Sequence, residues 1–321
     1  MPPLLTRLLT ADPASLAEAG AVLRAGGLVA FPTETVYGLG ADATSGTAVA
    51  KIYAAKARPH FNPLISHVPD LAAAERLGVF GPDARALAIA FWPGPLTLVV
   101  PAAPFCPVSD LARAGLDSIA LRVPAHPVAQ ALLRATGVPV AAPSANRSGR
   151  VSPTHVLHVM GDLDGRIDMA LDGGPTQVGV ESTIVACMGD IVRILRPGGV
   201  AREEIERVLG RTVEAAQAEA AITAPGMLAS HYAPNARLRL DATSVEKDEA
   251  VLDFGGRFAD VQAASFDLSP TGDLAEAASN LFAFLRALDA TGAQVIAVAP
   301  IPHGGLGEAI RDRLQRAAAP R

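Results

Sequence analysis

The first two-thirds of the chain alternates short apolar runs with segments of helical spacing. Apolar runs of strand length, most of them closed by a proline or a polar turn, predict β-strands at residues 28–31, 63–68, 96–100, 118–124, 138–142 and 191–195. Apolar residues recur every three or four positions over residues 14–25, 46–57 and 201–209, which predicts helices there. Strands that alternate with helices are typical of an α/β fold.

A break in this pattern divides the chain. Residues 211–224 are Ala-rich and weakly patterned, and residues 225–234 are punctuated by proline and glycine. A second unit follows, with strands predicted at 238–240, 250–254 and 295–299 and helices at 273–288 and 306–317. This alternation predicts a small parallel Rossmann-like domain, although it has no framed GxGxxG motif. We therefore predict a first domain over 1–210, a linker over 211–236 and a second domain over 237–321.

Polar side chains gather directly after two of the predicted strands. Residues 33–40 bring hydroxyls, a carboxylate and two glycines, and residues 143–149 bring hydroxyls, an amide and a glycine. Ligands bind beyond the carboxyl ends of strands in open α/β sheets, and backbone N–H groups with small hydroxyls suit a phosphate. Ordinary polar turns have the same composition, so these segments alone leave both interpretations open.

Lysine is rare in this chain. Only three of its 27 Lys and Arg residues are lysine, and two of them, Lys51 and Lys56, lie in one helical segment. Pro59 is expected to end that helix at Arg58, which places Lys56 and Arg58 at the helix exit. A compact ammonium and a planar guanidinium together would neutralise a polyphosphate. The alternative is a pair of cations that complements the helix dipole.

Two predicted strands end in arginine. Arg122 lies near the end of the 118–124 strand, and Arg196 directly follows the 191–195 strand. A buried guanidinium is expensive without an anionic partner, so we expect each arginine to meet an anion. The sequence leaves open whether that anion belongs to the protein or to a substrate.

Composition limits the kinds of partner and the location. Half of the residues are hydrophobic but only 4% are aromatic, which favours a core of small aliphatic side chains. The net charge of −5 and the pI near 5.8 give no global basic field, so we expect no strong direct nucleic-acid binding. Cys106 and Cys187 have no CxxC spacing and are expected to be buried hydrophobes. The chain shows neither a signal peptide nor an apolar run of about 18 residues, so we expect a cytoplasmic protein with no membrane contact.

Short motifs in a fixed order resemble those of the threonylcarbamoyl-AMP synthase family. They are FPTETVYGLG from Phe31, KxRP from Lys56, NPL from Asn62, WPGPLT from Trp92, RxP from Arg122, SAN from Ser144, ESTI from Glu181 and RPG from Arg196. The linker motif from Pro225 (PGM, then HYAP) and the closing motif from Gly305 (GLGxAI, then RLxRAA) resemble the two-domain members. The resemblance covers essentially the whole chain. It implies a YrdC-type twisted mixed-sheet catalytic domain followed by a small Rossmann-like parallel α/β domain.

The resemblance also implies a reaction. The chain would be an L-threonylcarbamoyladenylate synthase, a nucleotidyltransferase that converts ATP, bicarbonate and L-threonine into threonylcarbamoyl-AMP and pyrophosphate. Mg²⁺ would enter with ATP and take few protein ligands, so no residue is assigned to a metal. The product would pass to a tRNA threonylcarbamoyl transferase complex. The alternatives are an RNA-binding module or a carbamoyl-transfer module of the same fold.

The site residues implied by the resemblance fall into three groups. Those at the reacting phosphate would be Lys56, Arg58, Ser144 and Asn146. Those on ATP would be Arg58, Asn62, Ser118, Ser144, Ser152, Arg196 and Tyr232, with Ser148 as the alternative to Ser152. Those on threonine would be Thr35, His67, Arg122, Ala142 and Ser182, with Arg122 on the carboxylate. We further expect residues 225–234 to fold over the site as a lid, with Tyr232 closing on ATP.

Overall fold

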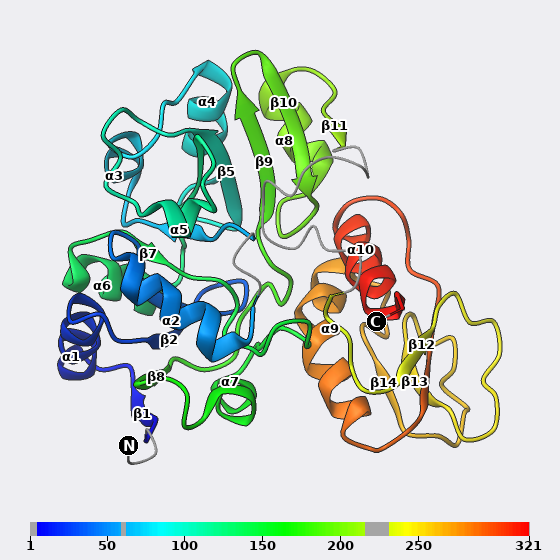
Figure 1. The fold of residues 1–321 in the computed structure, drawn as a ribbon. Helices are drawn as coiled ribbons and strands as arrows, with labels where there is room; N and C mark the ends of the chain where they lie inside the picture. The colour runs from blue at the N-terminus through cyan, green and yellow to red at the C-terminus, as the bar shows by residue number, and fades with distance from the viewer. Residues whose placement is uncertain (1–4, 59–61, 216–230, 321) are drawn as a thin grey trace.

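Two β-sheets, each with its own apolar core, organise the protein. The computed structural model describes residues 5–58, 62–215 and 231–320. A mixed sheet of eleven strands comes from the first part of the chain, and a parallel sheet of four strands comes from the last part (Figure 1). This architecture confirms the predicted fold class, a mixed-sheet α/β domain followed by a small parallel α/β domain. The predicted domain limits at residues 210 and 236 stay predictions.

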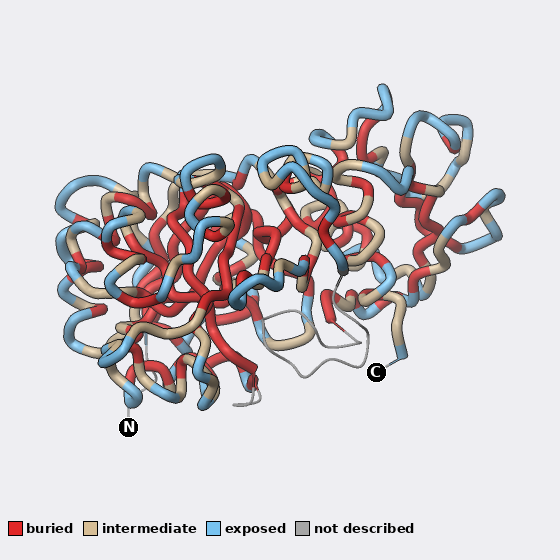
Figure 2. The backbone as a smooth tube through the Cα atoms, turned by 90° about the horizontal axis from the view of Figure 1, so that it is seen from above, coloured by how far each residue is buried: buried red, intermediate tan, exposed pale blue. Residues whose placement is uncertain are grey.

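The larger sheet has the strand order β1-β8-β2-β3-β7-β4-β6-β5-β9-β10-β11. Both of its faces are covered: Val29 and Phe31 pack in one apolar cluster, whereas Ala30 between them packs in another. Figure 2 shows the resulting concentration of buried backbone in this sheet. The strands are β1 (Arg7–Thr10), β2 (Val29–Pro32), β3 (Tyr37–Asp42), β4 (Ile65–His67), β5 (Leu96–Pro101), β6 (Ser118–Arg122), β7 (Val140–Ala141), β8 (Met169–Asp172), β9 (Thr183–Met188), β10 (Ile191–Arg196) and β11 (Glu214–Ala215).

Helices flank the larger sheet, and side-chain caps fix where several of them begin. Asp12 accepts a hydrogen bond from the Ser15 amide at 2.8 Å and so caps the start of the first helix. The helices are α1 (Pro13–Arg24), α2 (Gly46–Lys56), α3 (Leu71–Glu75), α4 (Pro82–Phe91), α5 (Asp110–Arg113), α6 (Pro127–Thr136), α7 (Val156–Leu163) and α8 (Arg202–Leu209).

Helix α2 ends at Lys56, two residues before the predicted end at Arg58. Ala57 adopts a left-handed conformation with φ of 51°, and this residue terminates the helix. Pro59, the predicted stop, lies outside the described residues. Lys56 therefore belongs to the last helical turn, and Arg58 leaves the helix in a new direction.

Residues 33–40, the first of the two polar segments that follow predicted strands, are more than a polar turn. They form the turn and second strand of a hairpin, in which β3 pairs antiparallel with β2. The Thr33 hydroxyl makes the turn by donating to the Val36 carbonyl at 2.7 Å. A Cβ on Gly40 would lie 2.9 Å from the Phe31 ring, so glycine lets the two strands pack closely. The glycines that make this packing possible also hide the strand signal in the sequence.

The smaller sheet has the order β12-β15-β13-β14, with every pair parallel. Its strands are β12 (Arg237–Arg239), β13 (Ala250–Asp253), β14 (Ser265–Asp267) and β15 (Val295–Val298), and its helices are α9 (Leu274–Asp289) and α10 (Leu306–Ala318). The sequence did not predict β14, because two of its three residues are exposed and carry no apolar run. The other strands and both helices lie where the pattern predicts them.

Helices α9 and α10 face the larger unit (Figure 1). Arg202 of α8 pairs with Glu308 of α10 at 2.5 Å, and Arg286 of α9 pairs with Asp162 of α7 at 2.7 Å. Val36 and Val151 of the larger unit belong to the same apolar cluster as the inner face of α9. Among the described residues, no helix combines the length and apolar character needed to cross a bilayer.

Candidate active site

A small cavity of about 40 Å³ lies where the two units meet. The strands β4, β6 and β10 end at it with His67, Arg122 and Arg196. Loop and linker segments complete the wall. The lining residues are Val36, Arg58, Ile65, His67, Arg122, Ala142, Pro143, Ser144, Glu181, Ser182, Arg196, His231 and Tyr232. Eight of the residues predicted for the site therefore share one cavity.

The loop that carries Ser144 is held by backbone pairing and by one lysine. The Leu39 amide donates to the Pro143 carbonyl at 2.7 Å, and the Ala145 amide donates to the Tyr37 carbonyl at 2.8 Å. Lys56 is buried, and its Nζ donates to the carbonyls of Ser144 and Asn146. Burial, together with the nearby charge of Arg58, lowers the pKa of Lys56 well below its usual value. Lys56 thus fixes the backbone of the loop and does not line the cavity.

Arg122 stands between a protein carboxylate and the cavity. Its Nη2 donates to Glu34 Oε1 and to the Thr35 hydroxyl, both at 2.8 Å. Burial alone would raise the pKa of Glu34, but the charge and hydrogen bond of Arg122 hold it below its usual value. The Nη1 atom of Arg122 makes no hydrogen bond to any described residue. Arg122 therefore has the anionic partner that burial requires and one donor group free for a ligand.

Two further guanidinium groups face the cavity. Arg58 is buried, and its Nη2 donates to the Pro63 carbonyl at 3.3 Å. Burial lowers the pKa of Arg58 to about 10, so it stays charged at neutral pH. Arg196 Nη2 donates to the Ser182 carbonyl at 2.8 Å. Among the described residues, three cations (Arg58, Arg122 and Arg196) and a single carboxylate, that of Glu181, face this cavity. The site is therefore suited to anionic ligands.

The carboxylate of Glu181 is itself fully engaged. Its Oε1 accepts from the Ser152 hydroxyl at 2.6 Å, and its Oε2 accepts from Arg313 Nε at 2.8 Å. Burial would raise the pKa of Glu181, but Arg313, Arg196 and Ser152 outweigh it and lower that pKa to about 2. Ser152 therefore does not line the cavity itself but holds Glu181, which does.

His231 and Tyr232 close the cavity from the linker side. Tyr232 is 1% exposed, and its ring lies between Phe282, stacked at 5.5 Å, and the guanidinium of Arg313, 5.2 Å from the ring centroid. His231 packs edge-on against the same ring at 4.0 Å. Of the predicted lid, residues 225–230 lie outside the described residues. Of the described part, 231–234, His231 and Tyr232 line the cavity in this structure.

Other predicted residues lie behind or beyond the cavity wall. Asn62 is buried and uses its carbonyl to accept from Tyr53 at 3.0 Å. Asn146 Nδ2 donates to the carbonyls of Arg147 and Arg150 and so braces its own loop. Ser118 lies four residues before Arg122 on the same face of β6, about 13 Å away at the usual rise of a strand.

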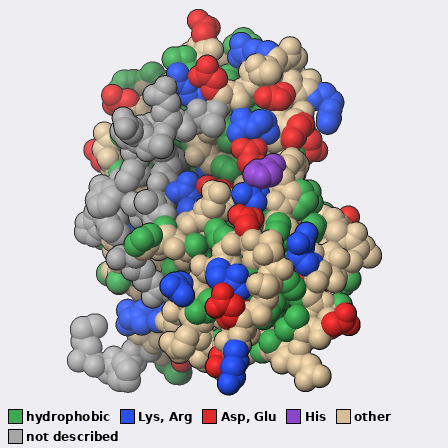
Figure 3. Space-filling model, turned by 90° about the vertical axis from the view of Figure 1, so that its right-hand side faces the viewer, with side chains coloured by type: hydrophobic (Ala, Val, Ile, Leu, Met, Phe, Trp, Pro, Cys, Tyr) green, Lys and Arg blue, Asp and Glu red, His purple; other side chains and the backbone are tan. Residues whose placement is uncertain are grey.

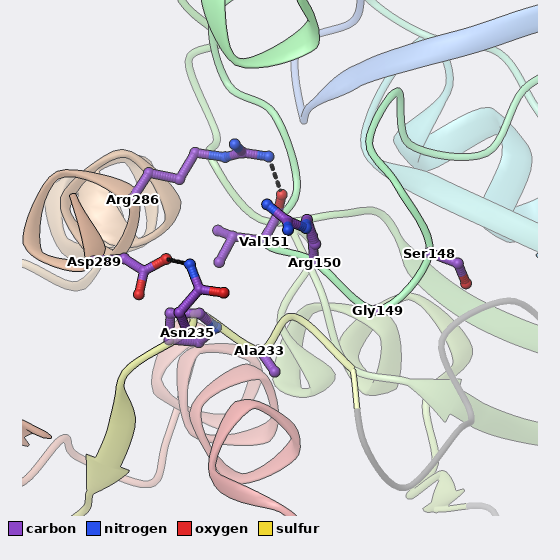
Figure 4. A pocket seen from close by; sticks show the side chains of 9 residues that line it. Ser148, Gly149, Arg150, Val151, Ala233, Asn235, Arg286 and Asp289 are labelled. Atoms are coloured by element: carbon purple, nitrogen blue, oxygen red, sulfur yellow. Dashed lines mark hydrogen bonds between the residues drawn. The ribbon is translucent and has the colours of Figure 1, made fainter. Parts of the chain in front are cut away.

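Ser148, the alternative to Ser152, lies at a different cavity. That cavity has a volume of about 260 Å³ and is bounded by residues 148–151, residues 233–235 and two side chains of α9. Figure 4 shows Arg286 reaching from α9 to the Val151 carbonyl, and Asn235 donating to Asp289, at 2.9 Å. Only Ser152 of the two serines contacts a group that lines the smaller cavity.

Sequence reasoning missed three groups that the structure brings to the site: Glu181, His231 and Arg313. Glu181 and His231 were visible as a charged and an aromatic side chain inside loop segments, but neither was assigned a role. Arg313 begins the closing RLxRAA motif, but it lies 132 residues from Glu181, and nothing local in the sequence points to that partner. The fold reveals the contact.

We expect the stability of the protein to fall as the pH drops below about 6.5. Burial lowers the pKa of both His67 and His231 to about 3 in the folded state, against an ordinary value of 6.5. Between these values the unfolded chain binds protons that the folded chain does not. The stabilisation is thus complete above pH 6.5 and is lost progressively below it, by roughly 1 kcal/mol per histidine at pH 5.5.

Urea unfolding at pH 7.5 and 5.5 measures this loss. His231→Gln should show a smaller drop, to which His67 still contributes together with His158, whose pKa burial lowers to about 4. Equal stability of the unmodified protein at both pH values would contradict the prediction. Glu181 contributes little to the change in stability between these pH values, because in the unfolded chain its carboxyl titrates near 4.5.

Comparison with known proteins covers both units. A family model described as "Telomere recombination" (Sua5, YciO and YrdC) matches residues 21–198, and one described as "Threonylcarbamoyl-AMP synthase, C-terminal domain" matches residues 200–319. The threonylcarbamoyl-AMP synthase of Bacillus subtilis is 44% identical over 98% of this chain and 95% of its own. The threonylcarbamoyl-AMP synthase of Pyrococcus abyssi is 42% identical over 94% and 93%, respectively.

A solved structure agrees with these sequence matches. The crystal structure of Pyrococcus abyssi Sua5 complexed with L-threonine superposes with a TM-score of 0.88 at 38% identity, covering 98% of this chain and 97% of the other. The match spans nearly the whole length of both chains. The chain therefore belongs to the threonylcarbamoyl-AMP synthase family, in its two-domain form.

Proposed function

We propose that this protein is an L-threonylcarbamoyladenylate synthase, a nucleotidyltransferase that uses ATP, bicarbonate and L-threonine. The observation that carries the proposal is the cavity itself. Its walls bring Arg122 and His67 together with Arg58, Arg196 and Ser144. A cavity with groups that suit both a carboxylate and a phosphate fits a reaction that joins an amino acid to a nucleotide.

The threonine end provides a cation and neutral polar groups. Arg122 Nη1 would bind the carboxylate of threonine. The hydroxyl of Thr35, which Arg122 contacts, and that of Ser182, which lines the same cavity, would add hydrogen bonds. Thr35 is already fixed by Arg122, and the Ser182 hydroxyl lies 2.8 Å from that of Thr97. His67, with a pKa of about 3, is neutral at working pH and therefore serves as a hydrogen-bonding group, not as a base.

The chemistry needs cations at the other end. The amine of threonine adds to carbon dioxide derived from bicarbonate and loses a proton, giving a carbamate. One carbamate oxygen then attacks the α-phosphorus of ATP, the bond to the bridging oxygen breaks, and pyrophosphate leaves with the bonding electrons. Two anions must approach each other, so Arg58 and Arg196 offset their repulsion, and donors of the Ser144 loop orient the phosphate.

Access requires the linker to move. Ligand sites for molecules of this size have volumes of roughly 300–1,000 Å³, whereas the cavity has about 40 Å³. Tyr232 and His231 form the wall that belongs to the linker. We propose that this segment swings outward to admit ATP and then returns to exclude water from the product, an acyl adenylate that water hydrolyses.

Mg²⁺ would accompany ATP in this proposal. Among the described residues, no three His, Cys, Asp or Glu side chains cluster as a metal site. The one carboxylate at the cavity is held by Ser152 and Arg313. Phosphate oxygens and water would therefore provide most of the ligands of the ion, as is common for Mg²⁺ bound with a nucleotide, and the ion would neutralise phosphate charge.

The product would be consumed by a tRNA threonylcarbamoyl transferase, and this protein need not bind the RNA itself. The face drawn in Figure 3 shows Lys and Arg side chains interspersed with Asp and Glu among its described residues. With a net charge of −5, this distribution favours a small-molecule enzyme over an RNA-binding module.

Pyrophosphate release tests the proposal directly. We expect release from ATP and bicarbonate to depend on L-threonine and to be much slower with L-serine or with no amino acid. Threonine-independent release would point to another acceptor and favour a carbamoyl-transfer module. No release together with salt-sensitive retention of tRNA would favour the RNA-binding alternative.

A further inference from the structure

Arg313 is a buried arginine of the second unit that lies at the active site of the first. Its side chain is 0% exposed within α10. Nε donates to Glu181 at 2.8 Å, Nη2 donates to the Pro197 carbonyl at 2.9 Å, and Nη1 donates to Asp312 at 2.5 Å. All three nitrogens of the guanidinium are therefore committed to protein acceptors.

Two of these contacts fix the loops that carry ligand-facing groups. Glu181 directly precedes Ser182, and Pro197 directly follows Arg196. The two loops also touch each other, since a Cβ on Gly198 would lie 2.3 Å from the Glu181 carbonyl. Arg313 thus joins two cavity loops that are close packed and come from different strands.

The face of the same guanidinium supports Tyr232. Arg313 lies 5.2 Å from the centroid of the Tyr232 ring, and Phe282 stacks on the ring at 5.5 Å. Tyr232 has a φ of 62°, a conformation that a tyrosine adopts only when its surroundings hold it. The position of the lid residue therefore depends on α9 and α10.

We propose that Arg313 is a positioning residue for the adenylation reaction. It holds Glu181, and through Glu181 also Ser152, in the geometry that binds ATP, and it supports Tyr232 in the same geometry. This inference rests on the proposed function and assigns a task to the second unit: it completes the nucleotide end of the site. Arg313 does not line the cavity, so it acts through the residues that it holds.

The competing interpretation is that Arg313 merely docks the two units. Arg202 and Glu308 provide the comparison, because they also pair across the units, from α8 to α10. Their side chains are 22% and 33% exposed, and neither residue lines the cavity. If docking were the whole role of Arg313, then breaking either pair would have the same kind of effect.

The test compares Arg313→Met with the control Glu308→Gln in the full-length protein. Methionine preserves much of the buried volume but none of the donors. We expect Arg313→Met to lower kcat/KM for ATP roughly 10- to 100-fold, the effect typical of residues that orient ligand-binding groups. Glu308→Gln should stay within about twofold of the unmodified protein.

The pH profile gives a readout that docking alone would not change. Glu181 is faced by Arg313, Arg196, His231 and Tyr232, with Asp312 behind Arg313. Without Arg313, burial raises the pKa of Glu181 above its present value of about 2. The acid limb of kcat/KM for ATP should therefore move to higher pH in Arg313→Met and not in Glu308→Gln. Adding Glu181→Gln to Arg313→Met should abolish that shift.

If Arg313→Met does not fold, Glu181→Gln approaches the same contact from the other side, and it should also lower kcat/KM for ATP. Kinetics and an acid limb indistinguishable from those of Glu308→Gln would overturn the proposal, as would an unchanged kcat/KM in Glu181→Gln. Absence of threonine-dependent pyrophosphate release in the unmodified protein would instead reject the proposed function.

Discussion

Replacing Arg122 with methionine should raise the KM for threonine roughly 10²- to 10³-fold while leaving the binding of ATP nearly unchanged. Loss of one member of a desolvated charge pair costs about 2–5 kcal/mol, and the threonine carboxylate would lose its cation. Initial rates of pyrophosphate release against threonine concentration measure the effect, and calorimetric titration with ATP provides the comparison.

The second partner of Arg122 must be controlled, because the substitution also leaves Glu34 without its cation. Glu34 keeps one hydrogen bond, from the Ala125 amide at 3.0 Å. The double variant Arg122→Met with Glu34→Gln removes the unpaired charge, so it should recover stability without recovering affinity for threonine. A threonine KM within twofold of normal in either variant would place the carboxylate elsewhere.

The sequence predicted well those features that depend on local pattern. Strands that end in His67, Arg122 and Arg196 were visible as apolar runs followed by polar residues. Parallel and mixed sheets bring such strand ends to one edge, which is why these side chains meet in one cavity. The burial of an arginine predicted an anionic partner for Arg122 without saying which, and the structure shows that Glu34 is one.

Features that depend on contacts between distant segments were beyond the sequence. Lys56 meets carbonyls 88 and 90 residues away, and a guanidinium from α10 meets Glu181 across 132 residues. No periodicity encodes such contacts, since they depend on how helices pack after the sheet has formed. The β3 strand was missed for a different reason: its glycines permit close packing but carry no apolar signal.

These long-range contacts explain why the second unit belongs to the enzyme. Arg286 reaches from α9 to the carbonyl of Val151, the residue before Ser152, and pairs with Asp162 at 2.7 Å. Both long helices of the parallel sheet thus hold loops of the larger unit in place. The linker between the units supplies the aromatic wall of the same cavity, so the three parts of the chain act as one site.

Replacing Lys56 with methionine should lower kcat/KM for ATP roughly 10²- to 10³-fold, as expected for the loss of a preorganised electrostatic group. The structure shows the ammonium on the carbonyls of Ser144 and Asn146, and Lys56 does not line the cavity, so the cause would be loss of order in the phosphate-binding loop. Lys51→Met is the matched control. Lys51 lies on the same helix, but it donates to the Gly26 carbonyl at 2.6 Å and does not line the cavity. Its loss should change the activity less than twofold.

Titration with AMP separates the two possible origins of the effect of Lys56→Met. If Lys56 orders the loop, AMP binding weakens along with ATP binding; if Lys56 instead contacts the β- and γ-phosphates directly, AMP binding stays normal and only ATP binding is lost.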